Sequence, residues 1–374
     1  MIRTSRAHLH VEAYSHQGMT GKNNEDRFAV ASYRVSESDR TPILFAVLAD
    51  GIGGHRGGEV AAELAVNHIM QSIAKGDGKF SRHYIEQAVN EASDAIASHS
   101  STNENLQGMG ATCAIAWIID NKLHTAYVGD SRIYLMRSGR IQQLTIDHSW
   151  VQEAVEKGIL TPELAREHPN VHVIRRYLGS PVPPEPDFRL NLFEGEGANH
   201  AENNQGAELQ PNDVLLLCTD GLTDLVWNDE ILEIVRTKSN LKDASRALVD
   251  LANDRGGHDN ITVILIGVPG DFKAKTELRK KKQVNRLPWA IGGVVGILLI
   301  LIAGSVLAFN LIRRNGTGTA TSTVSPAPLA EVTVTPLTSS TPTIVPTETA
   351  SPDVVLPLEP TLTLTPWPTN TTLP

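Results

Sequence analysis

The sequence predicts an α+β domain built on antiparallel sheet, followed by one transmembrane helix and a disordered tail. Three observations lead to this prediction. Residues 1–272 mix apolar, charged and glycine-rich segments, as a globular domain does. Residues 287–312 are almost wholly apolar, and residues 313–374 are rich in Thr and Pro. We therefore expect a globular domain over 1–272, a basic juxtamembrane linker over 273–286, a membrane helix over 287–312 and a tail.

The globular part alternates segments of strand and helix character. Runs rich in β-branched and other apolar residues predict strands at 43–50, 111–120, 123–130, 132–137, 213–220 and 260–268. Helices are predicted at 58–74, 82–99, 149–157, 161–167, 228–237 and 241–253. Several strands follow one another after short turns, which favours antiparallel sheet over repeated βαβ units. The polar stretch 195–212 is expected to form a surface loop.

The net charge of −9 is unevenly distributed. Segment 273–314 contains nine Lys or Arg and one Glu, and residues 315–374 contain four acids and no base, which leaves −13 for residues 1–272. A domain that acidic argues against nucleic-acid binding. Cys113 and Cys218 lie in strand-like apolar runs, and we expect both to be reduced thiols in the core.

The transmembrane helix is predicted from an uncharged run of 21 residues, Trp289–Phe309. At about 1.5 Å per residue this helix is roughly 31 Å long, which matches the hydrocarbon core of a bilayer. Seven basic residues precede the run, and only Arg313 and Arg314 follow it. The positive-inside rule then predicts a single-pass protein of the cell membrane, with residues 1–286 in the cytoplasm.

The tail is expected to be disordered and extracytoplasmic. Residues 315–374 contain 17 Thr and 11 Pro. Such a composition lacks the periodic apolar residues that bury a core, so the chain should stay extended.

Aspartates stand at the ends of the predicted strands. Asp50, Asp130 and Asp220 each close a strand-like run, and Asp259 opens one. Carboxylates placed in this way can converge at one end of a sheet, where their hard oxygens suit Mg²⁺ or Mn²⁺. Asp-Gly is also a common turn dipeptide, so the metal hypothesis depends on the whole set.

Seven blocks of sequence, in a fixed order, resemble the PP2C (PPM) family of metal-dependent serine/threonine protein phosphatases, in its bacterial form. They are NNEDRF (23–28), LADGIGGHRGGEVAA (48–62), GMGATCAIAWI (108–118), YVGDSRIYL (127–135), LTIDHSWV (144–151), LLLCTDGLTDLV (215–226) and GGHDNITVI (257–265). The resemblance covers residues 10–268. It implies a four-layer αββα sandwich of two antiparallel sheets flanked by helices, with a binuclear metal centre at one edge.

The resemblance also implies which residues hold the metals. Asp50 would bridge two Mn²⁺ or Mg²⁺ ions, and the Gly51 carbonyl would bind one of them. Asp220 and Asp259 would complete the other. Asp130 matches the position that holds a third, weaker ion in bacterial members.

Further residues are implied around the metals. Glu25, acting on a metal through water, and Asp26 would orient the attacking water, and Asn260 would support the ligands from behind. The implied reaction is hydrolysis of phosphoserine or phosphothreonine by a metal-activated water, since two divalent ions neutralise the phosphoryl oxygens and lower the pKa of water. No arginine follows Cys218 at the spacing that a covalent cysteine mechanism needs.

Two positions depart from the family's pattern. Gly21 stands where many relatives have an arginine that contacts the substrate phosphate. The adjacent Lys22 is a candidate phosphate-binding residue, with a solvated surface lysine as the alternative. Ile52 stands where eukaryotic members have a histidine. His55 is a candidate general acid, and a structural role in its glycine turn is the alternative.

The function that we expect is an active phosphatase at the cytoplasmic membrane face. Its partners would be phosphorylated proteins, including a membrane serine/threonine kinase that it opposes and the substrates of that kinase. Two other functions remain open: a pseudophosphatase that binds phosphorylated partners without turnover, and an envelope sensor. The intact Asp50, Asp220 and Asp259 argue against the first, and the tail's lack of a recognisable binding fold argues against the second.

Overall fold

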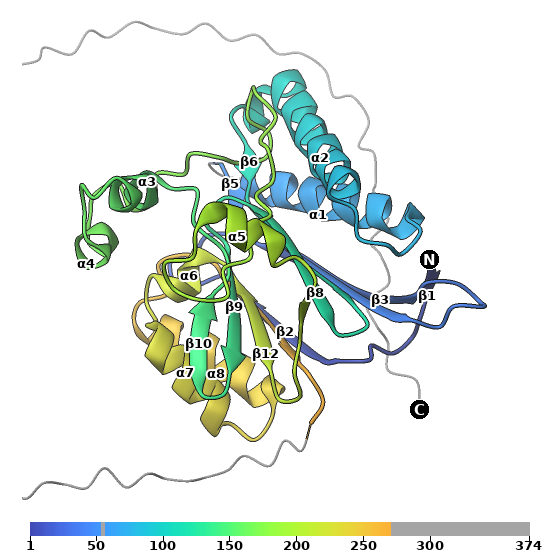
Figure 1. Ribbon diagram of the computed structural model, residues 1–374. Helices are drawn as coiled ribbons and strands as arrows, with labels where there is room; N and C mark the ends of the chain where they lie inside the picture. Colours follow the sequence, from blue (N-terminus) through green and yellow to red (C-terminus); the bar gives the residue numbers. More distant parts are fainter. Residues whose placement is uncertain (54–56, 271–374) are drawn as a thin grey trace, which may run out of the picture. The chain divides into compact units, whose positions relative to one another are not determined.

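Two antiparallel sheets form the centre of the fold (Figure 1). The structure, a computed structural model, describes residues 1–53 and 57–270. A six-stranded sheet has the order β1-β3-β4-β7-β8-β11, and a five-stranded sheet has the order β10-β9-β12-β13-β2. The strands are β1 (Ile2–Arg3), β2 (His10–His16), β3 (Arg27–Arg34), β4 (Pro42–Ala49), β5 (Gly51–Ile52), β6 (Gly110–Ala111), β7 (Cys113–Ile119), β8 (Lys122–Val128), β9 (Arg132–Arg137), β10 (Arg140–Gln143), β11 (Ala207–Glu208), β12 (Val214–Cys218) and β13 (Ile261–Gly267).

Helices cover the outer faces of both sheets. The two long helices α1 and α2 lie against the six-stranded sheet, and α7 and α8 lie against the five-stranded sheet (Figure 1). The helices are α1 (Gly57–Lys75), α2 (Arg82–Thr102), α3 (Trp150–Glu156), α4 (Pro162–Arg166), α5 (Ala198–Asn203), α6 (Asp220–Thr223), α7 (Asn228–Thr237) and α8 (Leu241–Asp254), with a 3₁₀ turn at Glu104–Leu106. The four-layer α+β arrangement is the one that the family resemblance implies.

The alternation of side chains along each strand fills three hydrophobic layers. In β4, Phe45 and Val47 pack with α1 and α2, whereas Leu44, Ala46 and Leu48 pack between the sheets. Strand β12 likewise divides its side chains between the inter-sheet core and the layer under α7 and α8.

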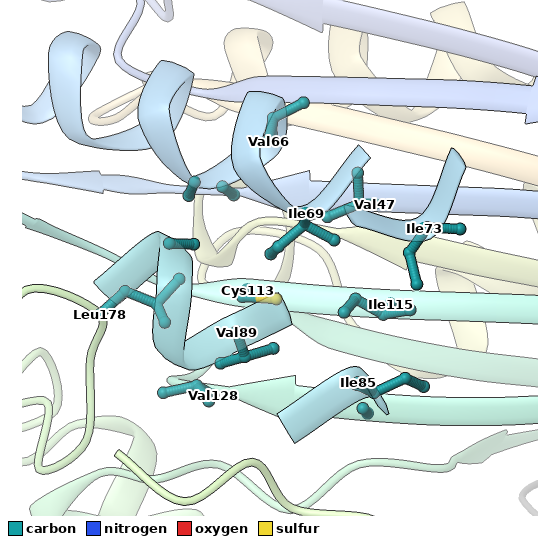
Figure 2. Packing of buried hydrophobic residues seen from close by; sticks show 14 of the residues in the cluster. Val47, Val66, Ile69, Ile73, Ile85, Val89, Cys113, Ile115, Val128 and Leu178 are labelled. Atoms are coloured by element: carbon teal, nitrogen blue, oxygen red, sulfur yellow. The ribbon is translucent and has the colours of Figure 1, made fainter. Parts of the chain in front are cut away.

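Figure 2 shows the outer layer on the side of α1 and α2. Ile69 and Ile73 of α1 and Val89 of α2 lie over Cys113 and other apolar side chains of the six-stranded sheet. Burial raises the pKa of the Cys113 thiol to about 12. This thiol is therefore a core group, as predicted, and the same holds for Cys218, whose pKa burial also raises to about 12.

The predicted strands and helices are all present, with ends that differ by a few residues. The strands β1, β2, β3, β5 and β10 lie outside the predicted strands, and helix α6 was not predicted. The prediction of a loop over 195–212 was partly wrong, because this stretch contains α5 and β11. Arg82 of α2 forms an ion pair with Glu202 of α5, a contact between segments 120 residues apart.

No helix within residues 1–53 and 57–270 is long and apolar enough to cross a membrane. The predicted basic linker (273–286), transmembrane helix (287–312) and tail (313–374) lie outside the described residues.

Candidate metal centre

Two of the predicted aspartates meet where β3 begins and β4 ends. Asp26 directly precedes β3, and Asp50 directly follows β4. The strands are antiparallel, and Arg27 pairs with Ala49. The register therefore brings Asp26 and Asp50 to the same end of the six-stranded sheet.

Strands of the second sheet place three more aspartates. Asp220 begins α6 just after β12, and Asp259 lies just before β13. Cys218 at the end of β12 pairs with Val263 near the start of β13, so these two carboxylates share one end of the five-stranded sheet. Asp130 lies in the turn between β8 and β9, which belong to different sheets.

The electrostatics show that the five carboxylates form one cluster. Burial raises the pKa of Asp50 well above its usual range, and the negative charges of Asp26, Asp220, Asp130 and Asp259 raise it further. Burial, followed by the charge of Asp220, has the same effect on the pKa of Asp130. A cluster of this kind is unfavourable unless protons or cations compensate its charge.

The hydrogen bonding of the buried Asp26 carboxylate indicates whether a divalent cation fits this site. Its side chain is 3 % exposed, and burial raises its pKa to about 7 against the opposing hydrogen bonds of Thr262 and Thr219. The Thr219 hydroxyl donates to Asp26 Oδ2 at 3.0 Å. In the described part of the chain, the buried Oδ1 has no hydrogen-bond donor. A buried acceptor oxygen that lacks a donor, beside four other carboxylates, would be satisfied by a water bound to Mn²⁺ or Mg²⁺. These residues therefore fit a hydrated divalent cation.

Two glycines allow the turn after Asp50 to approach the start of α1. A Cβ on Gly51 would lie 2.1 Å from the Gly58 carbonyl oxygen, and one on Gly58 would lie 2.6 Å from both Gly51 O and Glu25 Oε2. Neither position has room for a side chain. This packing brings the Gly51 carbonyl and the Glu25 carboxylate, both implied by the resemblance, to the same place.

Asn260 joins two distant parts of the site. Its Oδ1 accepts from the backbone N–H of Glu25 at 2.6 Å, and its Nδ2 donates to the carbonyls of Gln17 (3.0 Å) and Asn23 (3.1 Å). The side chain is buried. It therefore fixes the acidic segment before β3 against the start of β13, next to Asp259.

Thr112 and His148 support the aspartates from positions that the sequence did not reveal. The N–H of Asp50 donates to Thr112 Oγ1 at 2.9 Å, and Thr112 Oγ1 lies 2.8 Å from the hydroxyl of Ser131. His148 Nδ1 accepts from the N–H of Gly129 at 3.1 Å, and its Nε2 lies 3.3 Å from Asp187. The Thr112–Ser131 and His148–Gly129 contacts hold the turn that carries Asp130, one on each side of it.

A cavity of about 430 Å³ opens beside the carboxylates. Asp224 and Asp259 line it, together with the basic side chains of Lys22, Arg166 and His172. Arg166, His172 and Asp224 were not predicted from the sequence. A signal for Asp224 exists, because it follows Asp220 by four residues, the spacing of neighbours on one helical face. Neither basic residue has a comparable signal.

Lys22 and His55 are the candidates for phosphate binding and for the general acid. Lys22 is exposed at the cavity, and its charge lowers the pKa of Glu25, which burial and Asp259 raise. Gly21 has a φ of 76°, a backbone conformation that an arginine would adopt only with strain. His55 lies outside the described residues, and its role stays a prediction.

Comparison with known proteins points to one family. The sequence model described as "Protein phosphatase 2C" matches residues 14–262. The chain is 33% identical over 262 residues to the serine/threonine phosphatase stp of Listeria monocytogenes, covering 69% of this chain and 95% of the relative. It is 35% identical over 263 residues to the protein phosphatase PhpP of Streptococcus pneumoniae, covering 67% and 94%.

Solved structures agree with the sequence comparison. The serine/threonine phosphatase of S. agalactiae is 31% identical, with a TM-score of 0.60 over 70% of this chain and 99% of that one. The catalytic domain of the phosphatase PstP, in complex with two manganese ions, is also 31% identical, with a TM-score of 0.57 over 70% and 99%.

Proposed function

This chain belongs to the protein phosphatase 2C family, and from this premise we propose that it hydrolyses phosphoserine and phosphothreonine in proteins at the cytoplasmic face of a membrane. The convergence of Asp26, Asp50, Asp130, Asp220 and Asp259 at one end of two sheets supports the proposal. A cluster of five acids, one with a buried oxygen that lacks a hydrogen-bond donor, does not by itself stabilise the fold.

The enzymes of this family use two Mn²⁺ or Mg²⁺ ions. Asp50, the Gly51 carbonyl, Asp220 and Asp259 would hold them, and when bound they would supply charge neutralisation for the phosphoryl group and acidify a water. Asp26 would act on that water. Thr219 fixes one of its oxygens, and the other is free to accept a hydrogen bond from the water and orient it.

Lys22 and Arg166 would favour binding of the substrate phosphate at the cavity. Both bring positive charge to a rim that also contains Asp224 and Asp259. Once cations compensate the carboxylates, this positive charge attracts a phosphate dianion. Lys22 would make the direct contact, since Arg166 already donates to two backbone carbonyls.

The membrane location rests on the sequence of segment 273–314. An apolar run long enough to cross a bilayer follows a cluster of basic residues. A phosphatase held there would share the surface with membrane serine/threonine kinases, which raises the effective concentration of their phosphorylated targets. We propose that it opposes such a kinase.

The test is hydrolysis of a phosphothreonine peptide by purified full-length protein in detergent. We expect turnover with Mn²⁺ or Mg²⁺, loss of turnover in excess EDTA, and recovery when Mn²⁺ is restored. A matched phosphotyrosine peptide should react far more slowly. Binding of the phosphothreonine peptide without turnover would favour the pseudophosphatase, and full activity in EDTA would exclude the metal-dependent reaction.

A further inference from the structure

A histidine and two aspartates converge at the edge of the cavity. We propose that His172, Asp220 and Asp224 form an additional divalent-cation site, and that the imidazole nitrogen makes this site prefer transition ions such as Mn²⁺, Co²⁺ or Zn²⁺ to Mg²⁺. The inference rests on the proposed function because Asp220 is shared with the predicted pair of metals.

The ligands come from two segments that are far apart in the sequence. Asp220 begins α6 and Asp224 follows its last residue, with the N–H of Asp224 donating to the Asp220 carbonyl at 2.8 Å. This helical turn places both side chains on one side. His172 follows α4, and one ligand atom from each of the three residues lies within 4.8 Å of the others.

The distances suit a shared ion better than a direct contact. His172 Nδ1 lies 3.5 Å from Asp224 Oδ2 and 3.9 Å from Asp220 Oδ2. Both values exceed the roughly 2.7–3.2 Å of an N–H···O hydrogen bond. Two ligands each about 2.1 Å from one ion, at a tetrahedral angle, lie about 3.4 Å apart. The triad is therefore spaced approximately as ligands around one ion are.

Arg166 holds the histidine's segment at α6. Its Nη2 donates to the Thr223 carbonyl at 2.7 Å and to the Asp224 carbonyl at 3.1 Å, and its guanidinium lies 3.8 Å from the ring centroid of Trp227. The segment after α4 is further held by the N–H of Val173, which donates to the Asn170 backbone carbonyl at 3.1 Å. His172 thus reaches the carboxylates from a segment that is anchored to the same helix.

The donor set determines which ions the site prefers. Mg²⁺ favours oxygen ligands, whereas imidazole is a good ligand for transition ions. The side chain of His172 is 66% exposed and that of Asp224 is 34% exposed, so waters can complete the coordination. The third ion predicted from the resemblance was assigned to Asp130, which is buried and is not a member of this triad.

The experiment is Mn²⁺ binding to full-length protein without a histidine tag, followed by pulsed electron paramagnetic resonance. With Mn²⁺ beyond the two tight ions, the wild type should show ¹⁴N coupling from an imidazole, and His172→Asn should lose it. The variant should bind this extra Mn²⁺ at least about tenfold more weakly. Removing only the hydrogen-bond partner of a ligand already weakens metal binding by about tenfold or more, and this change removes the ligand itself. Asp224→Asn should also weaken it.

Controls separate this inference from the proposed function. His83→Asn, which removes an exposed histidine of α2, should leave ¹⁴N coupling and Mn²⁺ affinity unchanged. His172→Asn should keep the two tight ions and lose no affinity for Mg²⁺. If His172 only forms an ion pair with the aspartates, its removal would leave or strengthen Mn²⁺ binding. That result, or a wild type without ¹⁴N coupling, would overturn the inference. A wild type that binds no tight Mn²⁺ ions would instead overturn the proposed function.

Discussion

Asp26 shows how a buried carboxylate of the predicted metal centre can oppose stability. Its ordinary pKa of 3.8 rises to about 7 in the folded chain, chiefly because it is buried. The folded state therefore favours the protonated form. Below about pH 3.8 the carboxyl is protonated in both the folded and the unfolded chain, and the folded state is not penalised. As the pH rises from there through about 7, the free energy of unfolding falls.

We predict that Asp26→Asn stabilises the metal-free protein more at pH 8 than at pH 5. Thermal unfolding in EDTA, followed by circular dichroism, measures the difference. A change of about 1 kcal/mol corresponds to roughly 2–4 °C in Tm for a domain of this size. Asp94→Asn, at an exposed position of α2, should show no such dependence on pH. A gap between Asp26→Asn and the wild type that is equal at both pH values would contradict the electrostatic account.

Lys22 provides a second test at the scale of one residue. If it replaces the arginine absent at Gly21, Lys22→Ala should raise KM for phosphopeptides by at least several-fold, since a hydrogen bond to a charged group is worth about 1.5–3 kcal/mol. Mn²⁺ affinity should stay the same, as should both constants in the control Lys79→Ala, an exposed lysine. Unchanged kinetics would assign Lys22 to the solvated surface.

The sequence predicted those site residues that lie at the ends of strands. Asp50, Asp220 and Asp259 stand beside predicted strands, and antiparallel register then brings them together. His172 and Arg166 come from a short segment whose contact with α6 spans more than 50 residues. No periodicity or turn signal records such a contact, which depends on tertiary packing alone.

At the scale of elements, α4 is attached to α6 by few contacts. Arg166 supplies two hydrogen bonds to α6 and stacks on Trp227, whose side chain is half exposed. Segments held by so few interactions open locally more often than the core does.

Trp227→Ala should therefore increase the opening of the α3–α4 segment. An exposed cation–π contact is worth about 0.5–1 kcal/mol, which corresponds to a roughly two- to fivefold rise in the open population. Limited trypsin digestion at the exposed Lys157 and Arg175 should accelerate to that extent. Phe193→Ala, which removes another exposed aromatic side chain, should not change the rate. Equal digestion of both variants would show that Trp227 does not hold the segment.

Elements were predictable from sequence where apolar residues were dense. The strands β4, β7, β12 and β13 are buried along nearly their whole length and were all predicted. Strands β2 and β3 are only partly buried, and polar residues interrupt both. Helix α5 lies in a stretch without an apolar face, and its ion pair with Arg82 is a tertiary contact.

At the scale of the whole molecule, the layers follow from alternation, but their order does not. Alternation shows that a strand has two faces, and it cannot say which sheet or helix covers each one. The family resemblance supplied that order, and the three hydrophobic clusters agree with it.

The proposed membrane orientation predicts what an external protease removes. Proteinase K added to spheroplasts should trim only about the last 60 residues, because the basic residues before the apolar run resist translocation. An epitope at Met1 should survive and one at Pro374 should be lost. The opposite pattern would place the phosphatase domain outside, away from cytoplasmic kinases.

The central claim is that the clustered aspartates hold a pair of catalytic metals, and the number of tightly bound Mn²⁺ ions per chain tests it most directly. Equilibrium binding to the metal-free full-length protein should give two tight ions for the wild type and for Asp94→Asn. Asp50→Asn removes the carboxylate predicted to bridge the pair, so fewer than two should remain. Two tight ions in Asp50→Asn, or none in the wild type, would contradict the account.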